Sequence, residues 1–274
     1  SMSRFTRLLS WKWLALFLLV IAVLIWLAAI SMPSRDLTVS FLDVGQGDAI
    51  LIQTPSGQQI LVDGGPDAKS ISLELGKKMP FWDRSIDLLV LTQPEDDHLT
   101  GLLEVLRRYR VGGVLETGFQ CDTAAYEEWL RLVEAKSLER TIAHAGQQIE
   151  FANGIRVEVL HPPEGFLSGT GSDINNNSLV LRLSWREVSF LLAADIEAAA
   201  EREMLYGGMV SHSAVLKVAH HGSNTSTCMQ FLTAVAPDAA VISVGKDNPF
   251  GHPHQDTLTR IIGEVGQNHI YLTS

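Results

Sequence analysis

The sequence predicts an α/β (α+β) domain in which two packed β-sheets carry helices on their outer faces, preceded by one transmembrane helix. From Leu37 onward, short apolar runs alternate with Gly, Asp and Asn turns, and helical patterns stand between some of them. Hairpin-rich runs mixed with helices are typical of two facing sheets with helices outside. The 274 residues, 46% of them hydrophobic, suffice for one domain with a large core plus an appendage.

The appendage is the uncharged segment 14–30, LALFLLVIAVLIWLAAI, which with its flanking residues reaches bilayer-spanning length before a break at residues 32–34. A cleaved signal peptide and a buried core helix are the alternatives, but the apolar run is longer than that of a usual signal peptide. Three basic residues precede the segment, so the positive-inside rule places the amino terminus in the cytoplasm. We therefore expect residues 1–34 to form a single-span anchor in the cell membrane and residues 35–274 to lie outside the cytoplasm.

Apolar alternation and helical periodicity place the elements of the domain. The predicted strands are 37–41, 49–53, 59–62, 88–91, 114–116, 155–160, 178–183, 188–193, 215–218 and 239–244. The predicted helices are 71–78, 101–109, 124–135, 197–206, 229–236 and 255–265.

Net charge and cysteine content indicate which binding partners and stabilising groups to expect. A formal net charge of −10 argues against a basic surface that coats nucleic acid, so any such contact has to be local and metal-assisted. Cys121 and Cys228 are the only cysteines and lack CxxC spacing, so the sequence indicates neither a disulfide framework nor a thiolate zinc site. We expect unpaired buried thiols, although the two could pair in an oxidising compartment.

Polar clusters follow several predicted strands, where a rigid scaffold presents loop residues to a common cleft. The loop at 92–98, TQPEDDH, offers carboxylate and imidazole ligands for a divalent ion such as zinc or manganese. Helix capping explains one of its carboxylates but not three with a histidine. DVGQGD at 43–48 and DGG at 63–65 are weaker signals, because both sequences also suit ordinary turns.

Three more clusters complete the pattern at later strand ends. They are AAD at 193–195, KVAHHGS at 217–223 and NPFGHPH at 248–254. A strand-end aspartate can bridge metal ions. Adjacent imidazoles can bind a metal ion, act as a general acid or donate a hydrogen bond to a phosphate. The remaining histidines do not lie in such polar clusters, and we expect them to be structural or exposed.

These segments resemble, in order, blocks of the metallo-β-lactamase superfamily, and specifically the extracytoplasmic domain of ComEC-type competence proteins, which internalise DNA. The blocks are FLDVGQGDAILIQTPSG, ILVDGG, LVLTQPEDDHLTGL, NNNSLVL, LLAADIE, LKVAHHGS and NPFGHPH, from about residue 37 to the end. The resemblance implies an αββα sandwich with a metal cleft at one edge of the sheets. It also implies hydrolysis of DNA, single-stranded or the strand that is not imported, beside the channel portion of a DNA-uptake protein.

The resemblance also assigns residues. Asp97 and His98 match ligands of the second metal position, Asp195 matches the bridging carboxylate, and His252 is the preferred third ligand. His220 and His221 are then expected to bind or protonate the leaving group, although one of them could exchange roles with His252. The residues expected to support the site from outside the ligand set are Asp43, Asp63 and His254.

The first metal position departs from the family pattern. Gln93 stands where the family loop begins with His, and Glu95 stands at the usual His or Asp two residues later. Asn177 lies in the loop where relatives outside the competence branch have another His, and it is a possible residue of the first metal position. An amide is a poor zinc ligand compared with imidazole, so this position is weak and either one or two ions could bind.

The predicted function is metal-dependent hydrolysis of phosphodiesters, as a nuclease in natural competence. A DNA-uptake module with weakened catalysis is one alternative, and another hydrolase of the superfamily, such as a phosphocholine esterase, is a second. We expect residues 35–274 to lack the last short strand of the family. Whether the chain is part of a longer multi-span protein or a short free-standing relative stays open.

Overall fold

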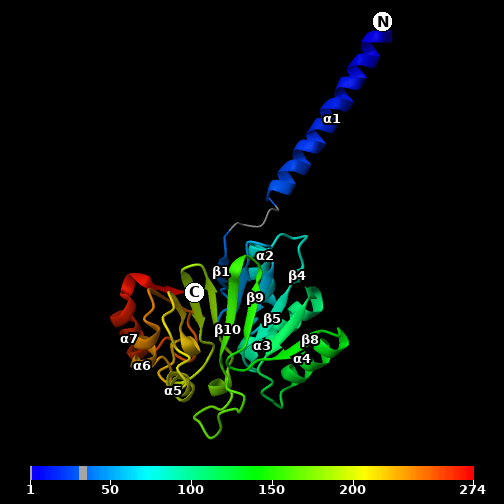
Figure 1. Ribbon diagram of the computed structural model, residues 1–274. Coiled ribbons are helices and arrows are strands. Elements are labelled where there is room, and N and C mark those ends of the chain that lie inside the picture. Colours follow the sequence, from blue (N-terminus) through cyan, green and yellow to red (C-terminus); the bar gives the residue numbers. More distant parts are fainter. Residues whose placement is uncertain (1, 31–35) are drawn as a thin grey trace. The chain divides into compact units, whose positions relative to one another are not determined.

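The computed structural model describes the backbone of residues 2–30 and 36–274 and the side chains of residues 11–27 and 36–274. Two compact units make up the chain, Ser1–Ser34 and Arg35–Ser274 (Figure 1).

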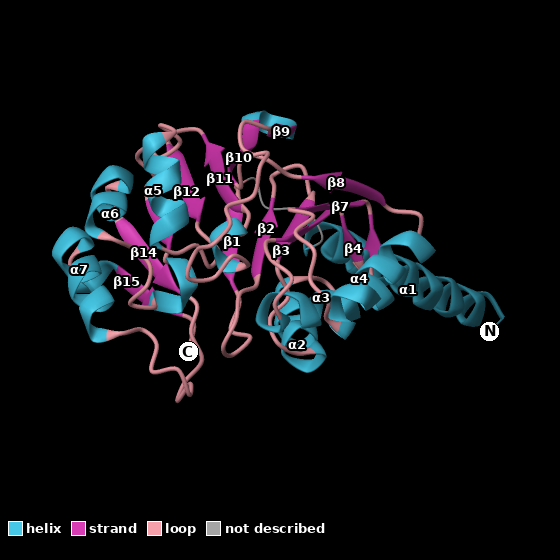
Figure 2. Cartoon of the chain, turned by 90° about the horizontal axis from the view of Figure 1, so that it is seen from below, coloured by secondary structure: helices cyan, strands magenta, loops and turns pink. Residues whose placement is uncertain are grey.

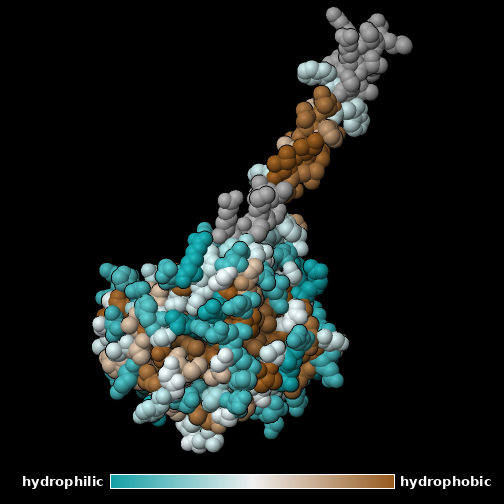
Figure 3. All heavy atoms as spheres, in the orientation of Figure 1, coloured by the Kyte–Doolittle hydropathy of each residue, from teal (hydrophilic) through white to brown (hydrophobic). Residues whose placement is uncertain are grey.

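Helix α1, Met2–Ile30, forms most of the first unit, and its described side chains are mostly apolar and exposed (Figure 3). In the part of the chain that the structure describes, no helix combines the length and apolarity needed to cross a bilayer. The transmembrane helix predicted at residues 14–30 is therefore not confirmed. The break predicted at residues 32–34 lies outside the described residues.

The second unit contains two large mixed sheets, which we call the N-terminal and the C-terminal sheet. The N-terminal sheet consists, in spatial order, of β1 (Thr38–Phe41), β2 (Ile50–Gln53), β3 (Gln59–Val62), β5 (Leu88–Leu91), β7 (Gly113–Glu116) and β8 (Glu139–Ile142). The C-terminal sheet consists of β15 (Ile270–Leu272), β14 (Ala239–Ile242), β13 (Val215–Lys217), β12 (Val188–Leu192), β11 (Val180–Trp185), β10 (Ile155–His161) and β9 (Gln148–Phe151). A short pair, β4 (Ser85–Ile86) and β6 (Arg110–Val111), stands apart from both.

Helices cover the outer face of each sheet, which gives the predicted sandwich (Figure 2). On the N-terminal sheet these are α2 (Ala68–Lys78), α3 (Asp96–Arg108) and α4 (Ala124–Ala135). On the C-terminal sheet they are α5 (Ala198–Tyr206), α6 (Met229–Val235) and α7 (Gln255–Val265). The mixed α/β architecture predicted from the sequence is confirmed.

The alternation of side chains along each strand divides the core into three layers. Leu51 and Leu61 pair across β2 and β3 and pack toward the helices of the N-terminal sheet. Ile50 and Val62, one residue along, pair in the same ladder but pack between the sheets. Because both faces are covered, these strands are apolar except for Gln53 and Gln59 at one end of the ladder, which makes them easy to predict.

Two kinds of element escaped the prediction. The edge strand β8 exposes all four of its residues, and β9 alternates exposed and half-buried residues, so neither has an apolar signature. Helix α3 begins at Asp96, five residues before the predicted start at residue 101. Its first turn is polar because it faces a cleft rather than the core, and its two aspartates complement the helix dipole.

One buried ion pair joins the two sheets. Lys217 at the end of β13 donates to Asp48 in the loop before β2, and both side chains are at most 2% exposed. Lys217 Nζ also donates to the Ala194 carbonyl oxygen at 3.1 Å. Removing one partner of such a pair leaves an uncompensated buried charge, which costs far more than the net contribution of the intact pair.

We predict that Lys217→Met lowers the free energy of unfolding by about 3–5 kcal/mol, because the Asp48 carboxylate loses its counter-charge. Urea denaturation of the full chain followed by circular dichroism measures this loss. The control is Lys78→Met on the exposed end of α2, which should change the value by no more than about 0.5 kcal/mol. Equal effects of both substitutions would contradict the prediction.

Candidate metal centre

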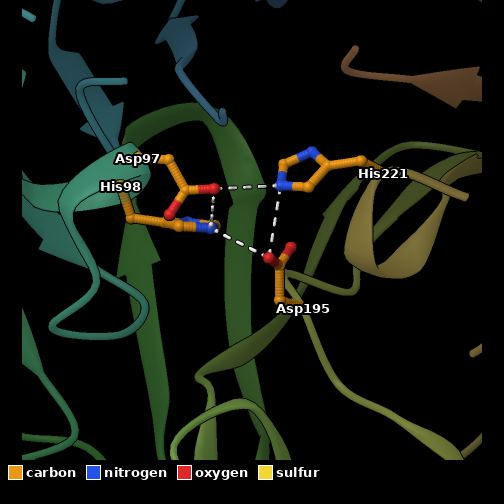
Figure 4. A group of neighbouring side chains, drawn as sticks. All are labelled: Asp97, His98, Asp195 and His221. Atoms are coloured by element: carbon orange, nitrogen blue, oxygen red, sulfur yellow. Dashed lines mark hydrogen bonds and ion pairs between the residues drawn. The ribbon is translucent and has the colours of Figure 1, made fainter. Parts of the chain in front are cut away.

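Four side chains from both sheets meet at one edge of the sandwich (Figure 4). Asp97 and His98 lie in the first turn of α3, directly after β5, while Asp195 follows β12 and His221 follows β13. One ligand atom from each lies within 4.8 Å of all the others. The strand ends predicted to converge therefore do so.

Asp195 is at the centre of the group. Its Oδ2 lies 3.1 Å from His98 Nε2 and 3.2 Å from His221 Nε2. Asp97 Oδ2 closes the other side, 3.4 Å from His221 Nε2 and 3.9 Å from His98 Nε2 (Figure 4). Two imidazole nitrogens and two carboxylate oxygens thus surround a single point.

Both imidazoles are fixed at their Nδ1 atoms, which leaves Nε2 toward the group. His98 Nδ1 lies 2.8 Å from Asp63 Oδ2, and Asp63 also accepts hydrogen bonds from the backbone and hydroxyl of Thr92. His221 Nδ1 donates to the Ser243 carbonyl oxygen at 2.8 Å. A carboxylate or carbonyl behind the ring is the usual support of a metal-binding histidine, because it sets the tautomer and the ring orientation.

The donor set fits a divalent ion. His221 Nε2 is buried and forms no directed hydrogen bond, although two carboxylates stand close to it. His98 and Asp195 are at most 1% exposed, so bulk solvent does not reach these two side chains. Imidazole nitrogen and carboxylate oxygen are ligands of zinc, manganese and iron, and an ion between them would satisfy every donor at once.

Burial and the close approach of charged groups shift the pKa values of these side chains. Burial alone would lower the pKa of His98, but Asp195, Asp63 and Asp97 together raise it well above its usual value. Burial is likewise outweighed at His221, whose pKa the neighbouring aspartates raise to about 10. Burial would raise the pKa of Asp195, yet the two imidazoles hold it well below its usual range. The metal-free chain therefore stabilises positive charge at this point.

Strained backbone places two of the four side chains. His220 and His221 both have positive φ, at 49° and 54°, and Ala194 immediately before Asp195 has φ 48°. A residue with a Cβ in this region costs about 1–3 kcal/mol and persists only where the surroundings enforce it. At these three positions the strain lies in turns that direct side chains toward the cleft, where functional strain is expected.

Close glycine packing sets the position of α3. A Cβ on Gly101 would lie 1.8 Å from the Gly64 carbonyl oxygen, and one on Gly64 would lie 2.4 Å from the Leu102 nitrogen. The 63–65 loop therefore presses its backbone against the first turns of α3. This contact brings Asp63 behind His98, so the DGG sequence is a support of the site and not only a turn.

His221, rather than the predicted His252, completes the four-residue group. The ring centroid of His252 lies 6.3 Å from that of His221 and 5.7 Å from that of His220, beside the group in the same cleft. Burial and the neighbouring histidines lower the pKa of His252 to about 4, so its imidazole is neutral. The sequence left open an exchange of roles between His252 and one of His220 and His221, and in the structure His221 stands beside the other three donors.

The other predicted supporting residues lie farther out. Asp43 is exposed and accepts from Gly45 N at 3.3 Å in its own loop. His254 is the N-cap residue of α7, and its ring centroid lies 4.9 Å from that of His252. Asp48 and Lys217 were not singled out, although DVGQGD and LKVAHH contain them, because sequence alone does not reveal that they pair.

The weak first position is incomplete in the structure. Gln93 is buried, with Oε1 accepting from Ser178 Oγ at 3.1 Å and Nε2 without a partner among the described residues. Burial and the charge of Asp97 raise the pKa of Glu95, which lines the cleft, to about 7.

The asparagine of this position differs from the prediction. Asn177 is occupied by the 167–173 loop, accepting from Leu167 N and donating to Leu167 O, both at 2.8 Å. Asn175 lines the cleft instead, and its Oδ1 is buried without a hydrogen bond. Successive asparagines point in different directions in this short helical turn, which the sequence could not resolve.

The group lies in a cleft of about 680 Å³. Its walls include the start of α3, His220 and the 249–252 loop. A cleft of this size accommodates a ligand well beyond a single small anion.

Comparison with known proteins identifies the family. The sequence profile described as the metallo-beta-lactamase superfamily matches residues 42–246. The chain belongs to this superfamily. Its members include hydrolases, and their fold implies divalent metal ions, in agreement with the donor set described above.

One of the curated relatives of the chain is named as a competence protein. The chain is 30% identical over 249 residues to ComE operon protein 3 of Bacillus subtilis, covering 82% of this chain and 30% of the relative. It is 29% identical over 233 residues to competence protein ComA of Neisseria gonorrhoeae, covering 84% and 30%. Recombination protein 2 of Haemophilus influenzae is 30% identical over 226 residues, covering 81% and 26%. The chain thus spans less than a third of these relatives.

Solved structures agree on the fold. The metallo-beta-lactamase fold protein YhfI of Bacillus subtilis superposes with a TM-score of 0.56 at 9% identity, covering 86% of this chain and 96% of that one. CmlA of Streptomyces venezuelae, a diiron beta-hydroxylase, also gives 0.56, at 14% identity over 88% and 53%. At these identities the likeness concerns the fold alone.

We predict that zinc or manganese raises the melting temperature of the full chain after treatment with a chelator, because the ion binds only the folded group. At a hundredfold excess over Kd the stabilisation is about 2.7 kcal/mol. Differential scanning fluorimetry measures the shift. His221→Ala should abolish it, whereas His212→Ala, at an exposed histidine outside the group, should keep it. An unchanged shift in His221→Ala would refute the assignment of this ligand.

A second prediction concerns the support behind His98. Asp63→Asn removes the carboxylate that fixes the ring, so metal affinity should fall about 10- to 100-fold. Isothermal titration calorimetry gives the affinity directly. Asp67→Asn serves as the matched control, because Asp67 caps α2 outside the site and asparagine is an equally good cap. Equal affinities of the two variants would contradict the prediction.

Proposed function

We propose that this chain is a metal-dependent phosphodiester hydrolase that acts on DNA during natural competence, on single strands or on the strand that is not imported. The observation that carries the proposal is the four-donor group of Asp97, His98, Asp195 and His221 at the base of the cleft. The competence relatives support DNA as the substrate.

In this proposal the four donors hold one zinc or manganese ion. A divalent ion supplies Lewis acidity and a bound water acidic enough to act as a nucleophile near neutral pH. Asp63 and the Ser243 carbonyl keep the two imidazoles in the tautomer that presents Nε2 to the ion. We propose one ion rather than two, because Gln93 is engaged by Ser178 and supplies only an amide.

His220 is the proposed acid for the leaving group. It lines the cleft beside the four donors, and its side chain is 22% exposed. Its Nδ1 lies 3.4 Å from Glu197 Oε1, so the carboxylate stands on the side of the ring away from Nε2. The opposite ring nitrogen is then free to give a proton to the departing sugar oxygen.

We also propose that the reaction takes place at the cell membrane, outside the cytoplasm, next to the channel portion of a DNA-uptake protein. The uncharged segment 14–30 and the basic residues before it support this location, as do the competence relatives. Fractionation of cells that express the full chain, with protease added from outside, tests it. A chain that stays in the soluble fraction would overturn this part of the proposal.

We predict that the full chain with manganese or zinc cuts labelled single-stranded oligonucleotides and that Asp195→Asn lowers the rate at least about 100-fold. The assay includes duplex DNA and p-nitrophenylphosphorylcholine, which tests the phosphocholine esterase alternative. Asp238→Asn is the matched control, since Asp238 is exposed and outside the cleft. Failure to cut any nucleic acid, with the ion bound, would overturn the proposal.

A DNA-uptake module with weakened catalysis is the second candidate, favoured by the buried amide of Gln93. On this alternative the wild-type chain binds an ion without cutting DNA, and Gln93→His creates activity by completing the first metal position. Metal stoichiometry by elemental analysis, measured beside the nuclease assay, separates the two candidates. Activity in the unmodified chain rules the second one out.

A further inference from the structure

Phe250 stands at the cleft with its ring largely bare. It lines the cleft that contains the four-donor group, and 61% of its surface is exposed. One neighbour is stacked on it: the His252 imidazole lies with its centroid 5.7 Å away and its plane tilted by only 24°. An exposed aromatic ring backed by a second flat ring leaves a face open toward a ligand.

The loop that carries Phe250 is held rigidly. Asn248 Oδ1 accepts from the backbone nitrogens of Phe250 at 3.2 Å and His252 at 3.0 Å. Its Nδ2 donates to the carbonyl oxygens of Gly245 at 3.0 Å and His252 at 2.7 Å. One side chain thus closes the loop with four hydrogen bonds. The backbone that carries the ring is thus held in place, which lowers the entropic cost of binding against it.

The charge of the cleft excludes the usual source of affinity for nucleic acid. Among its described lining residues, none is Lys or Arg, and Glu95 and Asp96 add negative charge beside the donor group. Phosphates beyond the one at the ion therefore meet no Lys or Arg side chain among the described residues that line the cleft. Affinity for a polyanion must come from a different contact, and stacking of bases on aromatic rings is such a contact, because every base has a π-face.

We propose that Phe250, backed by His252, is a stacking platform for an unpaired base next to the phosphodiester in the cleft. This inference rests on the proposed function and narrows it to single-stranded nucleic acid. A base inside a duplex has both faces covered by its neighbours and cannot stack on the ring without being extruded. The volume of the cleft, about 680 Å³, leaves room for a nucleotide rather than only a trimethylammonium group, the other ligand that an aromatic ring near acids can bind.

Fluorescence anisotropy with a short labelled oligothymidylate tests the platform. Phe250→Ala in the full chain should weaken binding about 10- to 100-fold, and Phe250→Trp should restore it, because either ring can stack. An abasic oligomer of the same length, with sugars and phosphates only, should bind all variants equally. Phe81→Ala removes another exposed phenylalanine, one outside the cleft, and should bind as wild type does.

Several outcomes would overturn the platform. These are an unchanged affinity of Phe250→Ala, an equal loss on the abasic oligomer, and duplex binding as tight as that of the single strand. A loss confined to p-nitrophenylphosphorylcholine would assign the ring to a quaternary ammonium instead. The anisotropy is measured both with the ion and with a chelator, so it needs no turnover. A chain that binds through Phe250 without cutting DNA would therefore refute the proposed hydrolysis and keep the platform.

Discussion

Three aspartates are buried where the two sheets meet, and the domain depends on the balance of their charge. Asp48, Asp63 and Asp195 are at most 2% exposed. Unpaired carboxylates in such a place would not stay ionised, since desolvation costs several kcal/mol per ion. Lys217 balances Asp48, and His98 lies between Asp63 and Asp195. Charge balance and sheet packing are one constraint here, because each pair joins segments from distant parts of the chain.

Much of the fold could be predicted because its central strands are covered on both faces. Their unbroken apolar runs identify them without any knowledge of pairing. The edge strand β8 is exposed throughout, so it has no apolar run and the sequence did not reveal it. The polar first turn of α3 was missed because side chains that line a cleft do not follow the apolar period of the helix.

The candidate site was predictable in part. Asp97, His98 and Asp195 stand at strand ends, and a sheet brings such positions together. The choice between His221 and His252 depends on a turn with positive φ at His220 and His221. Histidine does not predict this backbone conformation, so the sequence could not settle the choice. Asn175 and Asn177 present the same difficulty, since each step along a 3-10 turn changes the direction of the side chain by about 120°.

The donors are divided evenly along the chain, with Asp97 and His98 from the N-terminal sheet and Asp195 and His221 from the C-terminal sheet. A nascent chain in which only the N-terminal sheet has been synthesised contains two of the four donors. An ion gains its full affinity only after the second sheet has been synthesised and docked. An ion held by all four donors would therefore be acquired late in folding, and its identity would depend on the metals present where folding is completed.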